Sequence, residues 1–559
     1  MSGLPAQTTV LIVGAGPTGL TLGISLRQQG VDCIIIDTLP APLPWSRALG
    51  LHARTLEIFD ALGVLDAVTA RSLILKAVHV YGERGPLFSL DLTSLDAPHP
   101  HVLSCPQAEV ELCLAARFTA LGGMLIRGCE LLDFSQSAAG VQARVRWAEA
   151  EHQLGAALMV GCDGASSRVR QILGISFDGV RYADHFLLAD VDIDWPLARD
   201  ATHGFLLAEG ALIALPMPQG WRLVINQGAH DDLQPMPDLT PFRRRLALCL
   251  GEAPPLGEAR WLSRFSIHRR LAGRYRSNRV LLAGDACHIQ SPLGAQGMNT
   301  GIGDAFNLGW KLALYLRGIG GGALLDSYEL ERRPVARQML NAVDVLSRSS
   351  FTRTAPLRGV RDTVLRMVGN RPGFSSRLLR RASQLDIHYS GSPLVGASAS
   401  MVTQRRPAGP APGARVPDAL LAPVGEGPPV RLHGCLREAR FQLLIQLPPH
   451  PDHATVLTLY ALATRLPEDF DGLVGVQVIA AGEWPAELQD LTRSAFTLWQ
   501  DSQGAFQARF GEGGHLWLVR PDGHLAYRAP LADADHLLMW LNAALRRRSN
   551  ASAASVGSQ

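Results

Sequence analysis

The sequence is poor in lysine, in net charge and in long apolar runs, and each shortage excludes a class of protein. Among its 559 residues, Lys76 and Lys311 are the only lysines, so arginine carries nearly all of the positive charge. The formal net charge of +3 is small for this length and argues against a nucleic-acid partner. No stretch approaches about eighteen consecutive apolar residues, so we expect no membrane-spanning helix.

The cysteines also form no recognisable motif in the sequence. All 8 are scattered, with no Cys-x-x-Cys pair and no accompanying histidine cluster. This pattern speaks against a structural zinc site and against a disulfide framework, and it favours a reducing compartment. The first residues hold no basic segment followed by an apolar run and a cleavage site. We therefore predict a cytoplasmic protein with no metal and no membrane partner.

The length exceeds what one hydrophobic core fills, so two or three domains are expected. Alternating short apolar runs and helical patterns predict an α/β fold. The expected segments are a dinucleotide-binding domain (1–180), a β-sheet-rich unit (181–275), the second part of the binding domain with helices (276–395), a small α/β domain (396–547) and a disordered polar tail (548–559). The Pro/Gly-rich stretch from Arg405 to Pro429 is interpreted as a linker or an irregular crossover.

A glycine turn near the N-terminus is the first motif with a chemical meaning. An apolar run ends in Gly14-Ala15-Gly16-Pro17-Thr18-Gly19, a helical stretch follows, and a second apolar run ends in Asp37-Thr38. In such a pattern Gly14 makes the tight turn, Gly16 lets the backbone approach a pyrophosphate, and Gly19 permits close packing of helix and strand. The diphosphate meets the helix N-terminus. Asp37 is then placed to accept hydrogen bonds from a ribose, and a dinucleotide site is predicted.

A second strand end favours a flavin over a nicotinamide nucleotide. The apolar strand from Arg279 to Ala283 leads into Gly284-Asp285, and Gly297-Met298-Asn299 opens a long helix. A carboxylate at a strand end can hold a ribityl hydroxyl. Backbone N–H groups at a helix start can face the negatively charged O2/N1 edge of a reduced flavin. The alternative for Asp285 is a plain N-cap, which is the weaker interpretation once the glycine turn is present.

A third strand end lies between these two motifs. Gly161-Cys162-Asp163-Gly164 leads into a helical stretch that contains Arg170. Asp163 could orient the pyrophosphate region of a flavin, and Arg170 could pair with it or with a nicotinamide nucleotide. A simple strand–turn–helix with an N-capping Asp163 explains the same residues equally well.

In this order and spacing, the three motifs resemble the single-component (class A) flavoprotein aromatic hydroxylases, the group related to 4-hydroxybenzoate hydroxylase and phenol hydroxylase. Further matches are Arg47-Ala48, Arg54-Thr55-Leu56-Glu57, the pair Gln107 and Glu111, Ser383–Ile387, Gly413–Asp418 and Val519–Gly523. The last two segments resemble the branch with a C-terminal thioredoxin-like domain. The resemblance covers about residues 8–547. It implies a Rossmann-type FAD-binding domain interleaved with a β-rich substrate domain, and a thioredoxin-like domain over 396–547.

The resemblance also assigns roles to individual residues. Arg47, with Ala48 beside it, would meet the FAD phosphates, and Gln107 and the backbone near Leu131 would contact the isoalloxazine side and the adenosine end. Pro292 would place its carbonyl near the ring to be oxidised. Because only Cys435 lies in the C-terminal domain, no dithiol chemistry is expected there. A scaffold role, or a contact in a homodimer, is expected instead.

The activity implied is that of an FAD-dependent monooxygenase. It would take hydride from NADPH or NADH and hydroxylate a phenolic substrate with O2 through a flavin C4a-hydroperoxide. Gly318–Gly322 follows a helix rather than a strand, so a nicotinamide nucleotide would dock on a surface groove without its own Rossmann unit. Some relatives carry an acid where this chain has Leu49. His52 lies nearby and is the candidate base, against the alternative of a packed histidine.

The substrate walls are expected in the strand-rich region, where Phe186, Phe205, Trp221 and Phe265 are available, although alternation cannot tell which of them face a flavin. His288 is expected to be structural. Two alternatives share the fold. A flavin-dependent halogenase is disfavoured, because Trp221 stands in Gln-Gly-Trp-Arg-Leu-Val rather than in a Trp-x-Trp-x-Ile-Pro segment. A flavin-dependent oxidoreductase that inserts no oxygen would carry the same motifs.

Overall fold

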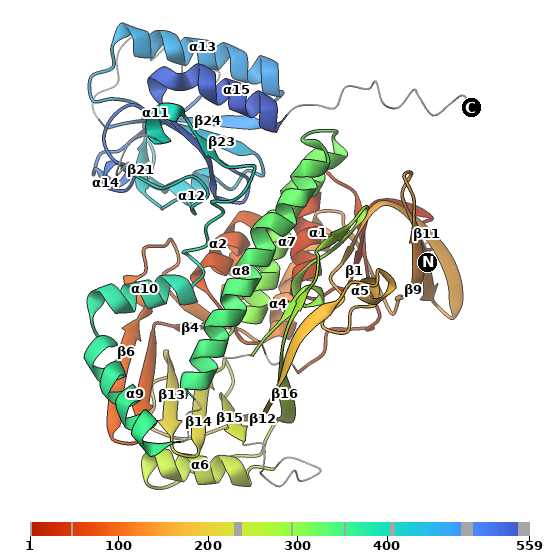
Figure 1. The fold of residues 1–559 in the computed structure, drawn as a ribbon, viewed down its shortest axis with the longest axis vertical. Coiled ribbons are helices and arrows are strands. Elements are labelled where there is room, and N and C mark those ends of the chain that lie inside the picture. Colours follow the sequence, from red (N-terminus) through yellow and green to blue (C-terminus); the bar gives the residue numbers. More distant parts are fainter. Residues whose placement is uncertain are drawn as a thin grey trace.

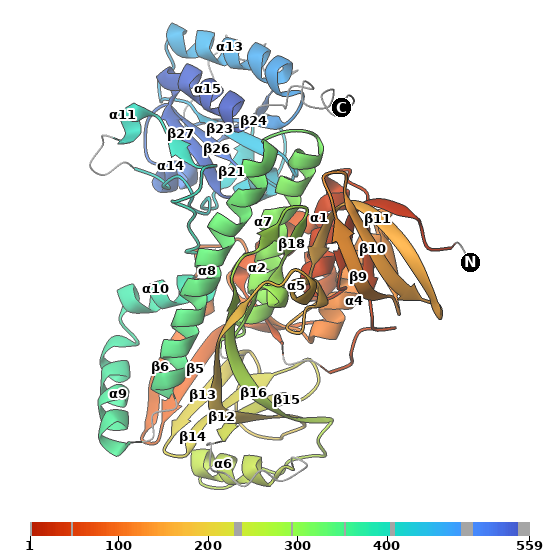
Figure 2. The same ribbon diagram turned by 45° about the vertical axis from the view of Figure 1, so that its right-hand side comes forward.

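A computed structural model describes residues 3–45, 48–227, 238–291, 294–350, 354–402, 408–481 and 496–545. Within them, three eight-stranded sheets and one three-stranded sheet form a mixed α/β protein. The second and third large sheets lie at opposite ends of the molecule, with the first sheet and the long helices between them (Figures 1 and 2). The predicted tail at 548–559 lies outside the described residues.

The first sheet is built on five parallel strands and carries the N-terminal motif. Its central order is β17-β18-β11-β1-β2-β8, and β10 and β9 extend β11 as antiparallel strands. Their bounds are β1 (Gln7–Val13), β2 (Cys33–Asp37), β8 (Met124–Arg127), β9 (Glu130–Gln136), β10 (Val141–Trp147), β11 (Ala150–Gly161), β17 (Arg276–Ser277) and β18 (Val280–Leu282). The last four residues of β1 are buried, as expected for a strand covered on both faces.

Helices of both halves of the chain pack on this sheet. The central ones are α1 (Pro17–Gln28), α4 (Gln107–Ala120), α7 (Gln296–Leu316) and α8 (Gly321–Ser350). As predicted, Gly318–Gly322 is the junction between two helices, α7 and α8. Shorter elements around them are α2 (Ala53–Leu62), α3 (Leu65–Thr69), α5 (Arg168–Ile172), and the three-stranded sheet of β3 (Gly50–Leu51), β7 (Val102–Ser104) and β4 (Leu73–Leu75).

The second sheet includes the strands of the expected β-rich segment, 181–275, together with strands from outside it. Its order is β19-β16-β12-β15-β14-β13-β5-β6. The strands are β5 (Ala77–Gly82), β6 (Gly85–Asp91), β12 (Phe177–Val191), β13 (Ala201–Leu207), β14 (Gly210–Pro216), β15 (Trp221–Gln227), β16 (Trp261–Ala272) and β19 (His288–Ile289), and α6 (Thr240–Leu250) covers one face. The hairpin β5–β6 lies outside the predicted limits of 181–275. It joins because β5 pairs in parallel with β13, a long-range contact that local patterns do not reveal.

The third sheet is formed by strands of the C-terminal segment, the one expected to be a small α/β domain (396–547). Its order is β20-β27-β26-β23-β24-β25-β21-β22, with β23 and β24 parallel and β26 and β27 antiparallel. The strands are β20 (Gly396–Ala397), β21 (Leu420–Pro423), β22 (Val430–Arg431), β23 (Phe441–Gln446), β24 (Val474–Ala480), β25 (Thr497–Gln500), β26 (His515–Val519) and β27 (Leu525–Pro530). The helices are α11 (Ala399–Val402), α12 (Leu432–Cys435), α13 (His453–Phe470), α14 (Ala505–Phe510) and α15 (Ala534–Ala544). We call residues 408–481 and 496–545 the C-terminal unit.

The interpretation of 405–429 as a linker is wrong for the part that the structure describes. Arg415, Val416 and Asp418 are buried, and Leu421 lies in a strand of the third sheet. The segment is the irregular crossover that we named as the other possibility. Most of the stretch from 413 to 423 is buried or half-buried, whereas residues 424–429 form an exposed turn between β21 and β22.

Candidate active site

Four adjacent parallel strands of the first sheet end at one edge, and this edge brings the three motifs together. The last residues of these strands are Val13 in β1, Asp37 in β2, Gly161 in β11 and Leu282 in β18. Just beyond them, Gly14 N–H donates to Ile36 O at 2.8 Å and Ala283 N–H donates to Gly161 O at 3.0 Å. In open α/β sheets, ligands bind outside the carboxyl ends of the strands.

The glycine turn has the local geometry that its spacing predicts. Gly14 has a φ of 108°, and a Cβ there would collide with the carbonyl oxygen of Cys162. A Cβ at Gly19 would collide with the carbonyl oxygen of Gly14, so helix α1 could not approach β1 as closely with any other residue. A Cβ at Gly16 would meet no atom within 4 Å. The turn is therefore tightly packed on its inner side and open at Gly16, as a pyrophosphate site requires.

Asp37 braces the same turn from the end of β2. Its carboxylate accepts hydrogen bonds from Ala15 N–H at 2.6 Å and from Leu39 N–H at 2.8 Å, and Thr38 beside it is exposed. Each carboxylate oxygen has a second lone pair, so these bonds leave acceptor capacity for a ribose. Pro17 is the first residue of α1, where its missing N–H leaves no helical bond unmade.

The Gly284-Asp285 turn packs directly on α1. A Cβ at Gly284 would lie 2.5 Å from Thr18 Oγ1, so the two turns are in contact. Asp285 is exposed to solvent, yet enough of the chain surrounds it that desolvation raises the pKa of its carboxyl; the nearby Asp304 adds to this rise and His288 opposes it. A carboxylate that is exposed to solvent but has much protein around it is typical of the wall of a groove.

The start of α7 faces the same edge. Ala295 precedes the helix in the left-handed conformation with a φ of 53°, and within the described residues no side chain caps the first turn. A Cβ at Gly297 would meet no atom within 4 Å, and Met298 is half-buried. The first N–H groups of a helix lack helical partners. This end of α7 is thus open and positive, as the flavin prediction requires.

The side chain of Asn299 has a role that the sequence did not suggest. It accepts from His52 N–H at 2.9 Å and from the Thr55 hydroxyl at 2.6 Å, and it donates to Gly50 O at 2.9 Å. Asn299 therefore ties the start of α7 to the start of α2. Its backbone N–H remains the group that could face a ligand.

His52 is a packed histidine. Its Nε2 lies 2.8 Å from Gly294 O and 3.3 Å from Gln296 Nε2, so the ring donates from Nε2 to the carbonyl. Burial lowers the pKa of His52 below its usual value. The ring is therefore neutral at pH 7. The alternative of a packed histidine accounts for all of these contacts, and the role as a base stays a hypothesis.

Asp163 and Arg170 hold local structure. Asp163 accepts from the Ser167 hydroxyl at 2.5 Å and from Val169 N–H at 3.0 Å, but the N-cap of α5 is Ser167, whose hydroxyl accepts from Arg170 N–H at 3.0 Å, and not Asp163 as the alternative had it. Arg170 donates to Ala286 O at 2.9 Å, so it joins α5 to the Gly284-Asp285 turn. The two motifs thus meet in space, and a cofactor role for Asp163 remains a prediction.

Some of the remaining predicted residues are among those that the structure describes, and others are not. Gln107, in the first turn of α4, donates to Glu111 at 2.7 Å. Burial raises the pKa of Glu111, and nearby Asp37 adds to the rise, which places this pair beside the end of β2. Leu131 is buried in β9, and Ala48 is half-buried before β3. Arg47 and Pro292 lie outside the described residues.

The second sheet separates the four aromatic candidates by face. Phe205 and Trp221 belong to the core under α6, on the face turned away from the first sheet (Figure 1). Phe186 and Phe265 stack at 5.6 Å on the opposite face. Half-buried apolar side chains on the strands between extend that second face, namely Ile213, Leu215 and Val224. This face, and not the one with Trp221, is turned toward the predicted flavin site.

A cluster of cations lies where β12 and β16 pair, next to α5. Arg170 and Arg270 stand 3.8 Å and 6.0 Å from the ring of Phe177, and Arg181 lies opposite His268 in the strand register. Desolvation lowers the pKa of His268, and Arg270 and Arg181 lower it further. Among the described residues, no ion pair joins any of the three arginines to a carboxylate, and the lowered pKa of His268 leaves its ring neutral at pH 7. The mutual repulsion of such a cluster favours an anion there.

Sequence reasoning missed a set of buried charges behind this edge. Asp304 accepts from Gly284 N–H at 3.2 Å, from His288 Nε2 at 2.7 Å and from Arg332 Nε at 2.7 Å. The structural role expected for His288 is confirmed by this contact. The missed signal was the spacing of Asp304 and Lys311, which places two charges on one face of a mostly apolar helix.

Two further searches of the described residues returned nothing. None of their helices is both long and apolar enough to cross a bilayer. None of their histidine, cysteine and carboxylate side chains gather in threes as metal ligands.

Comparisons with known proteins give one family and several close relatives. Residues 7–343 match a family model described as FAD binding domain. The chain is 30% identical over 553 residues to the pentachlorophenol 4-monooxygenase of Sphingobium chlorophenolicum, with 98% of both chains covered. It is 34% identical over 400 residues to the 12-dehydrotetracycline 5-monooxygenase/anhydrotetracycline 6-monooxygenase of Streptomyces rimosus, covering 69% of this chain and 78% of that one. A ternary complex of aklavinone-11 hydroxylase with FAD and aklavinone aligns over 98% of this chain and 100% of that one, with a TM-score of 0.75 and 26% identity.

Proposed function

Because the chain belongs to the FAD binding domain family of flavoprotein monooxygenases, we propose that it hydroxylates a phenolic or polyketide aromatic substrate with NADPH or NADH and O2. The observation that carries the proposal is the single edge at which β1, β2, β11 and β18 end. At this edge a Cβ at Gly16 or Gly297 would meet no atom within 4 Å, whereas a Cβ at Gly14 or Gly19 would collide with backbone atoms. The donors and the open backbone fit FAD, which is the cofactor of the family.

The residues that would hold FAD follow from this geometry. The start of α1 at Gly16 and Pro17 would receive the pyrophosphate, and Asp37 the ribose. Asp285 would hold the ribityl chain, and the N–H groups at Gly297 to Asn299 would face the O2/N1 edge of the ring. Bound FAD supplies the acceptor for hydride and the activation of O2. Arg47, Gln107, Leu131 and Asp163 remain proposed contacts on the strength of the family resemblance alone.

The chain itself must position the ring and exclude water from it. The face of the second sheet that carries Phe186, Phe265 and Val224 supports the proposal of an apolar substrate wall. Its buried charges, Asp190 and Arg222, pair with each other at 2.8 Å and so present no net charge to a substrate. Water exclusion and orientation are the usual contributions of such a wall. Pro292 is proposed to place its carbonyl at the ring.

A base role for His52 is the least supported part of this mechanism. A neutral imidazole could accept a phenolic proton, and burial keeps His52 neutral. Its Nε2, however, is committed to Gly294 O. Proton acceptance would therefore have to use Nδ1.

The cation cluster supports docking of the nicotinamide nucleotide. Arg170, Arg181 and Arg270 would face the phosphates of NADPH or NADH, whose negative charge would compensate the three guanidinium groups. Since Arg170 also contacts the Gly284-Asp285 turn, a nucleotide held there would lie close to the flavin site. This fits a surface groove without a second Rossmann unit.

The C-terminal unit is proposed to be a thioredoxin-like scaffold. Its parallel β23–β24 pair beside antiparallel β26 and β27, with α13 and α15 packed on one side, supports that fold. Its single cysteine, Cys435, excludes a dithiol in this unit. A homodimer contact and a cytoplasmic location stay proposals from the sequence.

Purified protein tests the proposal directly. We expect a yellow protein whose flavin bleaches with NADPH or NADH faster when a phenolic or polyketide ring is added, and a product heavier by one oxygen in mass spectrometry. Oxidation of the nicotinamide at a rate independent of any aromatic, with peroxide as the only oxygen product, would instead indicate the oxidoreductase that inserts no oxygen.

A further inference from the structure

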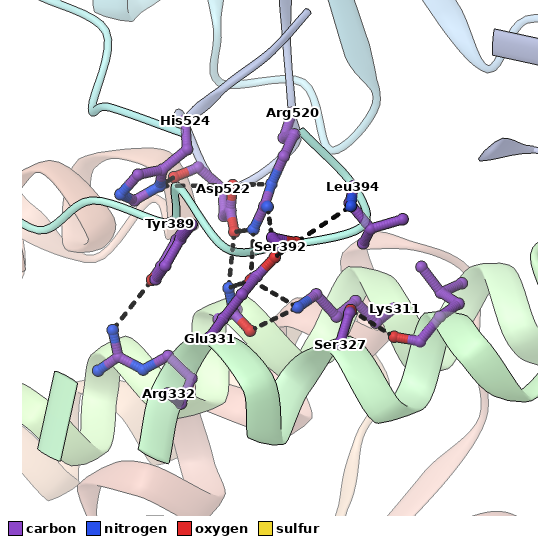
Figure 3. A network of polar contacts seen from close by, with 12 residues as sticks. Lys311, Ser327, Glu331, Arg332, Tyr389, Ser392, Leu394, Arg520, Asp522 and His524 are labelled. Atoms are coloured by element: carbon purple, nitrogen blue, oxygen red, sulfur yellow. Dashed lines mark hydrogen bonds and ion pairs between the residues drawn. The ribbon is translucent and has the colours of Figure 1, made fainter. Parts of the chain in front are cut away.

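A buried network of charges connects the C-terminal unit with α7 and α8 (Figure 3). It contains three cations and three anions whose side chains are at most 2% exposed: Lys311, Arg332, Arg520, Asp304, Glu331 and Asp522. The numbers of positive and negative charges in this network are equal. In the interior, each charge therefore depends on its oppositely charged partners for compensation.

Arg520 is the group by which the C-terminal unit enters this network. It stands in the turn between β26 and β27, and it donates both terminal nitrogens to the Glu331 carboxylate of α8 at 2.7 and 2.8 Å. Its Nε donates to Asp522 at 3.0 Å. The attraction of Arg520 holds the pKa of the Glu331 carboxyl well below its usual range, so that this carboxylate stays charged.

The next residue of α8 carries the link toward the first sheet. Arg332 donates to Asp304 at 2.7 Å and to Thr300 O at 3.1 Å, both on α7. Its third bond goes to the Tyr389 hydroxyl at 3.0 Å, and the Arg520 guanidinium lies 5.0 Å from the ring of Tyr389. Arg520 thus supports Arg332 by two routes, through its neighbour Glu331 and through Tyr389.

Both ends of this chain of contacts reach segments of the flavin site. Asp304 accepts from Gly284 N–H, which begins the turn with Asp285. Thr300 directly follows Asn299 in the first turns of α7. A displacement of Arg332 would therefore move the proposed ribityl contact and the proposed ring contact together.

We propose that Arg520 is a positioning residue for the flavin, acting from the C-terminal unit through Glu331, Arg332 and Asp304 on the Gly284-Asp285 turn and the start of α7. This makes the C-terminal unit part of the cofactor site, although none of its residues contacts the cofactor. The inference rests on the proposed function, because it assumes that FAD binds at that edge.

A second ion pair at the same boundary provides a matched control. Arg415 of the C-terminal unit pairs with Glu57 of α2, and their side chains are 5% and 2% exposed. This pair is nearly as buried as that of Arg520. Among the described residues, its link to the network runs through Arg54, which donates to Glu57 at 2.7 Å and to the backbone carbonyl of Asp522 at 2.5 Å, and not through Glu331, Arg332 or Asp304. Arg415→Met should weaken the attachment of the unit while the side-chain contacts of Glu331, Arg332 and Asp304 stay in place.

The experiment compares Arg520→Met, Arg520→Lys and Arg415→Met with the wild-type holoenzyme. Release of FAD is followed by its fluorescence on heating, unfolding by far-UV circular dichroism, and FAD affinity by titration of the deflavinated protein. We expect Arg520→Met to raise the FAD Kd about tenfold, by analogy with metal sites, where losing a residue that supports a ligand costs roughly 10–100-fold in affinity, and to release FAD before the chain unfolds. Arg520→Lys should recover part of the loss. In Arg415→Met, release and unfolding should shift together.

Tyr389→Phe keeps the test decisive if Arg520→Met does not fold. It removes one acceptor from Arg332 and changes no charge, so we expect a smaller shift of FAD release in the same direction and an altered visible spectrum of the flavin. Equal behaviour of Arg520→Met and Arg415→Met would overturn the inference. So would wild-type flavin release and spectra in both Arg520→Lys and Tyr389→Phe. A wild-type chain that binds no FAD would instead contradict the proposed function.

Discussion

Glu331 is the most connected anion of the buried network, and removing its charge should be strongly destabilising. Besides the two bonds from Arg520, it accepts from Lys311 Nζ, from Asn307 Nδ2 and from the Ser392 hydroxyl, at 2.7, 2.7 and 2.5 Å. In Glu331→Gln the new amide group turns N–H donors toward other donors. Lys311 and Arg520 then share only Asp522 as a counter-charge.

The magnitude follows from what breaking a buried pair costs. Removing one partner is destabilising by about 3–5 kcal/mol, because an uncompensated charge stays in the interior. In a cooperative unit of about 150–250 residues, each kcal/mol lowers the midpoint of unfolding by about 2–4 °C. We therefore expect Glu331→Gln to melt roughly 6–20 °C below the wild type. Burial already lowers the pKa of Lys311 to about 8, so Lys311 is the charge most sensitive to the loss.

A double variant separates charge compensation from lost packing. In Glu331→Gln/Lys311→Met the network again balances, with Arg520 against Asp522 and Arg332 against Asp304. Coupling between groups in one network reaches about 0.5–3 kcal/mol, so the double variant should melt several degrees above Glu331→Gln alone. Thermal melts by circular dichroism measure both. If the double variant melted at or below Glu331→Gln, charge compensation would not be what holds these helices together.

Three further predictions concern the glycine turn, the buried carboxylate of Glu57 and the ring of His52. Gly16→Ala should leave the melting temperature of the deflavinated protein unchanged but weaken FAD binding in a titration, whereas Gly19→Ala should lower that melting temperature and weaken FAD binding; equal thermal stability of the two deflavinated variants would contradict the assigned packing. Arg415 and Arg54 hold the pKa of the Glu57 carboxyl well below its usual value of 4.5, so the stability from this group is present above about pH 4.5 and lost as the pH falls further. Glu57→Gln should therefore show a shallower loss of stability in acid, and a curve parallel to the wild type would refute this. His52→Ala should change the pH profile of product formation if His52 is a base, and an unchanged profile would leave it a packing residue.

Much of the site could be read from the sequence because its motifs are local. The glycine turn, the strand end at Asp37 and the Gly284-Asp285 turn each lie within a few residues, and backbone conformation there depends on those residues alone. The aromatic side chains could not be assigned to a face for the opposite reason. Trp221 and Val224 lie three residues apart in one strand and therefore on opposite faces, and only the position of α6 tells which face is core.

The sequence by itself determined the cofactor edge: strands that end in glycine turns and acids, in the order of a known family. Tertiary structure alone decided what stands behind that edge. The hairpin β5–β6 joins a sheet more than a hundred residues away in the chain, and most of the stretch from 413 to 423 packs against the rest of the C-terminal unit instead of spanning solvent. Most of all, Arg520 and Glu331 compensate each other across 189 residues. A buried charge is stable only beside its partner, and which charges become partners is settled by how separate segments pack, not by any pattern within one of them.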